Sequence, residues 1–300
     1  MAELIAESLS KNFGGFRALD EVSFKLEGNG CHGYLGPNGA GKTTTMKLFT
    51  TLLRPSRGKA LVNGFEVSKH PTQALKSVGA LIEDPEPYNF MTVQEFIEFA
   101  VKIRDENKTP DLTHLNELLD LPPMDRKCSR LSKGQKRRVY IAALAAQDPE
   151  ILILDEPSAG LDPAESVVFR NMIIQLKKER TVFLSSHLLY EVTQVCDSVL
   201  FVNKGKIVES GTVEELSKKF VSKALRVEFT TAIDESNVKG WQDRGLVSGY
   251  QKESDRAFVL DFDGREETRK ALVDAAYSLG LRTIQDAKLG LEQAYLDLVK

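Results

Sequence analysis

Residues 36–43 have the sequence Gly36-Pro37-Asn38-Gly39-Ala40-Gly41-Lys42-Thr43, which fits the pattern G-x-x-x-x-G-K-[ST]. Glycines at this spacing let backbone N–H groups turn inward around a polyphosphate. Lys42 is then placed to reach the β and γ phosphates, and the Thr43 hydroxyl can ligate Mg²⁺. A glycine-rich turn that merely caps a helix is the alternative, but average composition produces this pattern in only about one chain in a hundred. The stretch therefore predicts a phosphate-binding loop, or P-loop.

The residues on either side of the loop predict an α/β fold. His32–Leu35 is a short strand-like stretch before the loop, and a helix is expected to begin near Lys42. Strand, glycine turn and helix in this order open an α/β nucleotide-binding fold. Upstream, Ala18–Leu26 alternates apolar and polar residues, as a half-buried strand does.

A second apolar run ends in two carboxylates. Ile151–Leu154 is continuously apolar, which is typical of a strand buried on both faces of a parallel sheet, and Asp155 and Glu156 follow it. Beside a P-loop, Asp155 can hold the Mg²⁺ shell, and Glu156 can polarise a water for attack on the γ phosphate. Alone, such an acidic pair usually marks a solvated strand end. Together with the P-loop, it predicts nucleotide hydrolysis.

A third motif lies between these two. Leu131-Ser132-Lys133-Gly134-Gln135 stands at the expected start of a helix. A helix N-terminus with a hydroxyl and a glycine is a natural anion site. The alternative is an ordinary Ser132 N-cap, worth about 1 kcal/mol. For these five residues taken alone, the N-cap is the better interpretation.

The remaining pattern predicts two domains. Residues 85–146 are helical in periodicity, with a capping box formed by Thr92 and Glu95. The first domain is expected to end near Phe220, and residues 221–300 are expected to form a small α+β domain. The other predicted elements are the helices after Pro110 and Ser132, the strands Thr181–Leu184, Val199–Val202, Lys206–Val208, Val227–Thr230 and Ala257–Phe262, the helix Arg265–Leu279, and a final helix with Leu291, Tyr295 and Leu298 on one face.

Composition narrows the class of protein. The chain has 300 residues, of which 42% are hydrophobic and 28% charged, as in an ordinary globular protein. A net charge of −3 provides no global basic field to attract nucleic acid. Cys31, Cys128 and Cys196 show no C-x-x-C spacing, which favours reduced thiols in a cytosolic compartment. No apolar run approaches the roughly 20 residues that span a bilayer, so at a membrane another chain is expected to hold this one.

The motifs occur in one fixed order, which resembles that of an ABC ATPase. GPNGAGKT is followed by LSKGQ, then by ILILDEPSAGLD at residues 151–162, and then by His187 after an apolar strand. The resemblance covers about Leu4–Phe220. It implies a P-loop NTPase with a RecA-like core, an antiparallel β subdomain and an inserted helical subdomain. It also implies an ATP-hydrolysing subunit of a membrane transporter, at the cytoplasmic face, with ATP and Mg²⁺ as cofactors.

The resemblance further implies a role for individual residues. Phe13 is similar to the aromatic that stacks on adenine, with core packing as the alternative. The implied nucleotide-binding residues are Phe13, Gly36, Pro37, Asn38, Gly39, Ala40, Gly41, Lys42, Thr43 and Thr44; the catalytic residues are Glu156 and His187; and the metal ligands are Thr43, Glu83 and Asp155.

The family works as a dimer, and the resemblance therefore implies roles between two subunits for the remaining motifs. Ser132, Gly134 and Gln135 resemble the signature that contacts ATP held by the opposite subunit, and Asp162 resembles the residue that couples the two sites. The implied partners are a second nucleotide-binding subunit, identical or different, and a separate polytopic membrane subunit. Nucleic acid is not an expected partner. The basic cluster Lys133, Lys136, Arg137 and Arg138 is expected to be a solvated helix face or part of the dimer interface.

Two positions depart from the family pattern. Lys133 stands where the commonest signature has a glycine. Glu83 stands where the family has a glutamine after the strand that ends at Ile82. Some subunits that export antibiotics or peptides have the same acidic residue, which favours an exporter. Glu83 is expected to reach the Mg²⁺ and the attacking water; the alternative is that it points to solvent.

Two other functions compete with transport. A soluble ABC ATPase of DNA repair usually has a long coiled coil between the P-loop and the acidic strand, whereas Lys42 and Asp155 lie 113 residues apart here, with no heptad run. A translation-type member usually carries two such domains in one chain. A P-loop kinase would leave LSKGQ and His187 unexplained.

Overall fold

The structure is a computed structural model that describes residues 2–219 and 224–286. The chain divides into two compact units, Met1–Val213 and Glu214–Lys300. The sequence predicts this division near Phe220, and in the structure it falls at the start of helix α8 (Val213–Lys219). The predicted final helix lies outside the described residues. No helix in the described ranges has both the length and the apolar character needed to cross a bilayer.

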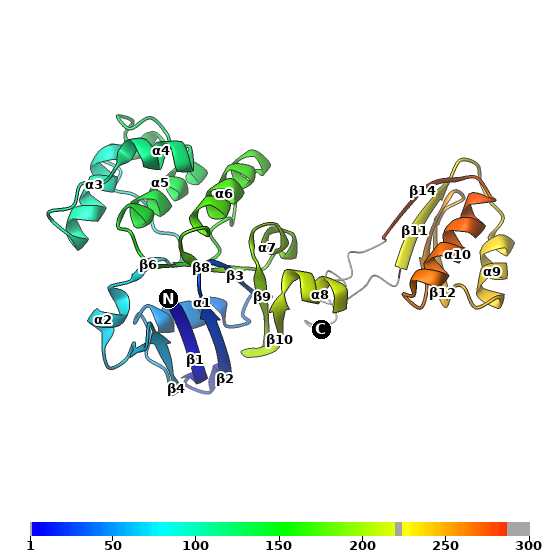
Figure 1. Cartoon of the computed structure of the whole chain (residues 1–300), viewed down its shortest axis with the longest axis horizontal. Helices are drawn as coiled ribbons and strands as arrows, with labels where there is room; N and C mark the ends of the chain where they lie inside the picture. Colours follow the sequence, from blue (N-terminus) through cyan, green and yellow to red (C-terminus); the bar gives the residue numbers. More distant parts are fainter. Residues whose placement is uncertain (1, 220–223, 287–300) are drawn as a thin grey trace. The chain divides into compact units, whose positions relative to one another are not determined.

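A six-stranded sheet in the order β10-β9-β3-β8-β7-β6 forms the centre of the first unit (Figure 1). All neighbours are parallel except β10, which pairs antiparallel with β9. Because the carboxyl ends of parallel strands meet at one edge, the loops after β3, β7 and β8 come together there. The strands are β3 (Gly30–Leu35), β6 (Val78–Leu81), β7 (Ile151–Leu154), β8 (Thr181–Ser186), β9 (Ser198–Asn203) and β10 (Lys206–Thr212).

A second, antiparallel sheet in the order β2-β1-β4-β5 belongs to the same unit (Figure 1). Residues of both sheets and of helix α1 share one buried core. Within it, the rings of Phe24, Tyr34, Phe49 and Phe183 contact one another at centroid distances of 5.5 to 6.3 Å. The elements are β1 (Glu3–Phe13), β2 (Phe16–Glu27), α1 (Lys42–Phe49), β4 (Arg57–Val62) and β5 (Phe65–Glu66).

Helices α3, α4 and α5 form a helical subdomain (Figure 1). The predicted capping box is confirmed, because Glu95 N donates to Thr92 Oγ1 at 3.2 Å and Thr92 N donates to Glu95 Oε2 at 2.7 Å. Core, antiparallel sheet and helical insertion together confirm the predicted P-loop fold. The helices of the unit are α2 (Pro71–Leu75), α3 (Val93–Arg104), α4 (Leu112–Leu119), α5 (Lys133–Ala146), α6 (Pro163–Leu176) and α7 (Leu189–Val195).

The described part of the second unit has the order strand, helix, strand, strand, helix, strand. Its antiparallel sheet runs β12-β13-β11-β14, which is the ferredoxin-like arrangement. Trp241, Phe229 and Phe258 lie in a core separate from that of the first unit. The elements are β11 (Ala224–Phe229), α9 (Glu235–Asp243), β12 (Gly249–Ser254), β13 (Ala257–Asp261), α10 (Glu266–Tyr277) and β14 (Leu281–Asp286).

Separate cores predict separate unfolding transitions. Trp241 is the single tryptophan of the chain and is 2% exposed, so its fluorescence reports the second unit alone. Phe258→Ala should lower the free energy of unfolding of this unit by about 3 to 5 kcal/mol, because a fully buried ring is lost. Tryptophan fluorescence in a urea titration measures the effect. Phe183→Ala, the control in the first unit, should leave this transition in place; an equal shift would show that the units unfold together.

Candidate functional site

The P-loop joins β3 to α1, and its glycines are required by close contacts. A Cβ atom on Gly36 would lie 2.2 Å from the carbonyl oxygen of Val202. Gly41, the N-cap of α1, has φ 104°, and a Cβ there would lie 2.8 Å from the carbonyl oxygen of Ala18. Gly39 also has a positive φ, of 80°. The loop can therefore turn its N–H groups inward only with glycine at these positions.

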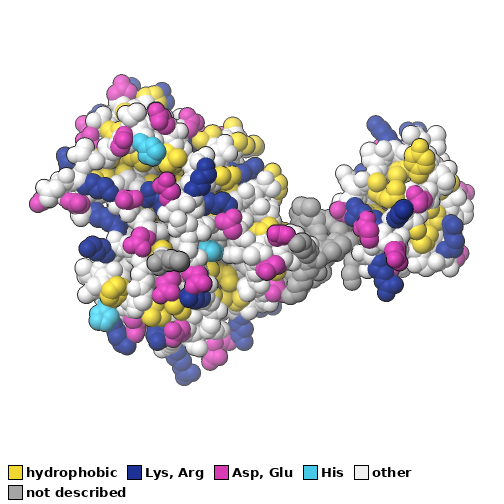
Figure 2. All heavy atoms as spheres, viewed as in Figure 1, with side chains coloured by type: hydrophobic (Ala, Val, Ile, Leu, Met, Phe, Trp, Pro, Cys, Tyr) yellow, Lys and Arg dark blue, Asp and Glu magenta, His cyan; other side chains and the backbone are white. Residues whose placement is uncertain are grey.

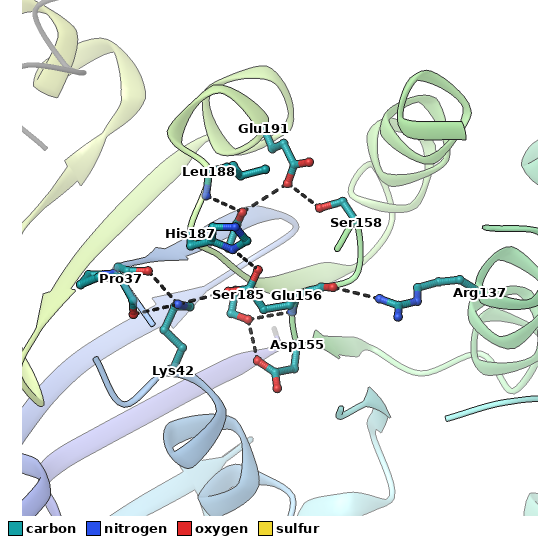
Figure 3. A network of polar contacts seen from close by, with 12 residues as sticks. Pro37, Lys42, Arg137, Asp155, Glu156, Ser158, Ser185, His187, Leu188 and Glu191 are labelled. Atoms are coloured by element: carbon teal, nitrogen blue, oxygen red, sulfur yellow. Dashed lines mark hydrogen bonds and ion pairs between the residues drawn. The ribbon is translucent and has the colours of Figure 1, made fainter. Parts of the chain in front are cut away.

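Lys42 is held at the mouth of this loop (Figure 3). Its side chain is almost fully buried, and Nζ donates to the carbonyl oxygens of Gly36 at 2.7 Å and Pro37 at 3.1 Å. Nζ also lies 3.1 Å from Glu156 Oε1. A cation held by neutral carbonyls and one carboxylate can exchange these partners for phosphate oxygens, which are stronger acceptors.

The two acidic residues after β7 share one serine, which contacts the carboxylate of Asp155 and the backbone of Glu156 (Figure 3). Ser185 Oγ, on β8, donates to Asp155 Oδ1 at 2.7 Å and accepts from Glu156 N at 2.8 Å. Glu156 Oε2 lies 2.8 Å from His187 Nδ1. The structure thus brings Lys42, Asp155, Glu156 and His187 together. Sequence reasoning missed Ser185, although a polar residue at the end of an apolar strand could have signalled it.

Two further serines hold the loops that carry Glu156 and His187 (Figure 3). Ser158 Oγ donates to the carboxylate of Glu191, and Ser186 Oγ donates to the same carboxylate at 3.2 Å. Ser186 Oγ also accepts from Leu188 N at 3.0 Å. The sequence pattern did not reveal this cross-link either, because Glu191 lies on α7, 33 residues after Ser158.

One cavity of about 260 Å³ opens beside the P-loop. Phe13 lines it and is 46% exposed, so the alternative that Phe13 packs in the core is wrong. Lys11 Nζ lies 5.0 Å from the Phe13 ring centroid, in cation–π range. The lining residues are Phe13, Phe16, Ala18, Asn38, Gly39, Gly41, Lys42, Thr43, Thr44 and Glu156.

A neighbouring cavity of about 330 Å³ collects the expected metal ligands Thr43, Glu83 and Asp155. Their hydroxyl and carboxylate oxygens are ligands that suit Mg²⁺. Among the described residues, no group of three or more His, Cys, Asp or Glu side chains could hold a metal ion. Glu83 is largely exposed and forms an ion pair with Lys47 of α1.

Ser132, Gly134 and Gln135 of the signature lie at the start of α5, outside these two cavities. Gln135 N donates to Ser132 Oγ at 3.1 Å, and Ser132 N donates to Gln135 Oε1 at 3.1 Å, so the pair caps α5. A Cβ on Gly134 would lie 2.8 Å from the carboxyl carbon of Glu165. Asp162 caps α6 by accepting from Glu165 N at 2.9 Å. Ser132, Gly134, Gln135 and Asp162 line neither of the two cavities.

The basic cluster at the start of α5 is less solvated than the sequence predicts. A solvated face is wrong for Arg137 and Arg138, which are 5% and 7% exposed. Lys133 and Lys136 instead form surface ion pairs with acidic residues of the loop after β6. Figure 2 shows acidic and basic side chains interspersed on the face of the first unit in view.

Comparison with known proteins places this geometry in a family. Residues 19–159 match the ABC transporter family. The ABC transporter ATP-binding protein YxlF of Bacillus subtilis is 30% identical over 302 residues, 99% of each chain. The chain belongs to the ABC transporter ATP-binding proteins. Another relative, the bacitracin transport ATP-binding protein BcrA of Bacillus licheniformis, is 34% identical over 70% of each chain.

Solved structures of ABC transporter ATP-binding subunits have the same fold as the first unit. The ATP-binding subunit of an ABC transporter is 28% identical with a TM-score of 0.63, covering 72% of this chain and 92% of that one. A nucleotide-free ATP-binding cassette is 26% identical with a TM-score of 0.63, covering 73% of this chain and 94% of that one. The protein is therefore an ATP-binding ABC ATPase, and its P-loop cassette occupies the first unit.

Lys42→Ala should weaken binding of a non-hydrolysable ATP analogue by about 10- to 100-fold, because a charge-assisted hydrogen bond contributes about 1.5 to 3 kcal/mol. Equilibrium titration of the purified chain measures this. Lys59→Ala is the control, since Lys59 pairs with Glu7 on the surface of the antiparallel sheet. Equal affinities for the Lys42 variant and the wild type would contradict the assignment of the P-loop.

Proposed function

We propose that this ABC ATPase hydrolyses Mg-ATP at the interface of a dimer and thereby powers an exporter. The observation that carries the proposal is the convergence of Lys42, Asp155, Glu156 and His187 at one sheet edge. Ser132, Gly134 and Gln135 of the signature lie outside both cavities, whereas Lys133 lines the second one. One chain therefore supplies a phosphate site and a base. Ser132, Gly134 and Gln135 are left to face the nucleotide of a second chain.

The first cavity fits the nucleotide. Phosphates would lie on the inward N–H groups of the P-loop, and Lys42 would leave the carbonyl oxygens of Gly36 and Pro37 for them. The exposed ring of Phe13 would stack on adenine, with Lys11 beside the ring. Thr44 lines the same cavity.

The second cavity fits the metal. Thr43 and Asp155 would hold Mg²⁺, and Glu83 would reach it after leaving Lys47. When bound, Mg²⁺ neutralises charge on the β and γ phosphate oxygens. Ser185 occupies one oxygen of Asp155 and so orients the carboxylate.

Glu156 is the proposed general base. Its carboxylate lies within hydrogen-bond reach of His187, and its backbone N–H is held by Ser185. A water between this carboxylate and the γ phosphate would give up its proton to Glu156. His187 would keep the carboxylate in place and contact the γ phosphate.

An exporter is favoured over the soluble alternatives by two observations. Glu83 occupies the position that is acidic in the resembling exporters, and a relative over 70% of the chain is a bacitracin transport protein. We propose a separate membrane subunit, with this chain at the cytoplasmic face. A groove of about 280 Å³ suits its docking, because Tyr88, 50% exposed, lines it and Phe90, 71% exposed, stacks on Tyr88.

Glu156→Gln should keep ATP binding and stop hydrolysis, because the amide keeps the shape of the site but cannot take a proton. Bound, uncleaved ATP should then hold two chains together, which size-exclusion chromatography with Mg-ATP detects. The double variant Lys42→Ala, Glu156→Gln is the control and should stay monomeric. Hydrolysis at the wild-type rate in Glu156→Gln would remove this residue from the role of base.

Glu83→Ala should raise the Mg²⁺ concentration needed for half-maximal ATP hydrolysis, and Glu83→Gln should raise it less, because an amide oxygen can still ligate. ATPase rates measured against Mg²⁺ concentration test this. Glu86→Ala is a matched control, since Glu86 pairs with Lys136 and does not line the metal cavity. Superimposable curves for the wild type and both Glu83 variants would show that Glu83 does not bind Mg²⁺.

A further inference from the structure

We infer that Arg137 is a positioning residue for the general base, acting by holding the backbone of Glu156 and tying it to the loop after β6. The inference rests on the proposed role of Glu156. It assigns a function to a buried arginine that neither the P-loop nor the signature explains.

Glu156 has an unfavourable backbone conformation. Its φ is +44°, in the left-handed region that side chains other than glycine rarely adopt. Such a conformation persists only when surrounding contacts hold it. A return to negative φ would re-aim the carboxylate away from His187 and Lys42, which it now meets at 2.8 and 3.1 Å.

Besides the hydrogen bond that Ala159 N donates to the carbonyl oxygen of Glu156 at 3.1 Å, two side chains hold the backbone of Glu156 from opposite sides (Figure 3). Ser185 Oγ accepts from its backbone N–H at 2.8 Å, and Arg137 Nη1 donates to its carbonyl oxygen at 2.9 Å. These contacts flank the strained Cα, one on each peptide group. Ser185 comes from the central sheet and Arg137 from α5, so the conformation of Glu156 depends on both subdomains.

Arg137 is itself anchored. Its side chain is 5% exposed, and Nη2 forms an ion pair with Asp84. Lys133 Nζ lies 2.9 Å from the other oxygen of Asp84. A planar guanidinium can serve the carbonyl and the carboxylate at once, which a lysine ammonium does less well.

This arrangement links three parts of the ATPase. Asp84 follows β6, Arg137 lies on the helix that begins at the signature residue Ser132, and Glu156 follows β7. Any movement of α5 or of the loop after β6 therefore acts on the backbone of the base. Hydrolysis would proceed at full rate only when α5 and Asp84 are in the positions seen here.

Arg138 provides a matched control on the same helix. It is equally buried, at 7% exposure, but its partners are Asp120 and Glu165, neither of which contacts Glu156. Loss of either arginine removes a buried guanidinium and its ion pairs from α5. Only the loss of Arg137 removes a side-chain hydrogen bond from the carbonyl oxygen of the base, which is then left with the bond from Ala159 N.

The experiment compares Arg137→Ala, Arg137→Lys and Arg138→Ala in the full chain. Arg137→Ala should lower kcat at least tenfold and change the Kd of a non-hydrolysable ATP analogue less than twofold. Arg137→Lys should recover part of kcat. Arg138→Ala should lower the thermal midpoint as much as Arg137→Ala yet keep kcat within twofold of wild type. Equal effects of the two alanine substitutions on kcat would overturn the inference.

A double substitution separates positioning from general damage. Adding Arg137→Ala to Glu156→Gln should not reduce the residual rate further, because the group that Arg137 positions is already inactive. A further tenfold loss would show that Arg137 acts elsewhere. If Arg137→Ala does not fold, Asp84→Ala replaces it and should lower kcat about threefold or more with unchanged Kd; wild-type kcat in that variant would overturn the inference.

A wild-type rate in Glu156→Gln would instead refute the proposed base. In that case the proposed function fails, and the inference about Arg137 fails with it because it rests on Glu156 as the base. If Glu156→Gln is inactive in hydrolysis while Arg137→Ala is fully active, the present inference alone is refuted.

Discussion

Strands β3, β7 and β8 are parallel neighbours, and this constraint makes the site possible. Each strand ends at the same edge, so the lysine after β3, the carboxylates after β7 and the histidine after β8 meet although they lie far apart in the sequence. The aromatic cluster beneath α1 then holds the P-loop helix against the sheet. Charged side chains at the edge are brought together by the apolar strands below them.

Sequence predicted the parts of this site that depend on short-range pattern. The P-loop, the acidic pair and the Thr92–Glu95 capping box need only a few neighbouring residues, so spacing reveals them. Apolar runs revealed β7 and most of β8 because strands buried on both faces are largely apolar. The antiparallel sheet was harder: β1 has register shifts between Ala6 and Leu9 and again before Asn12, which break the alternation that marks a strand.

Contacts between distant segments could not be predicted from spacing. Arg137 is bound by Asp84, 53 residues earlier, and by the carbonyl of Glu156, 19 residues later. Its basic neighbours in the sequence suggested a solvated face, and only the fold buries it. The positive φ of Glu156 is equally invisible in the sequence, because that conformation is imposed by Ser185 and Arg137 rather than by the residue itself.

The cap at the start of α5 gives Ser132 a direction. Its Oγ accepts the hydrogen of Gln135 N, which engages a lone pair and leaves its own O–H hydrogen available to a further acceptor. A hydroxyl polarised in this way offers a proton rather than an electron pair. Together with the positive end of the helix, it selects anions such as phosphate and disfavours cations. The serine can therefore donate to an anion while the helix keeps its first turn intact.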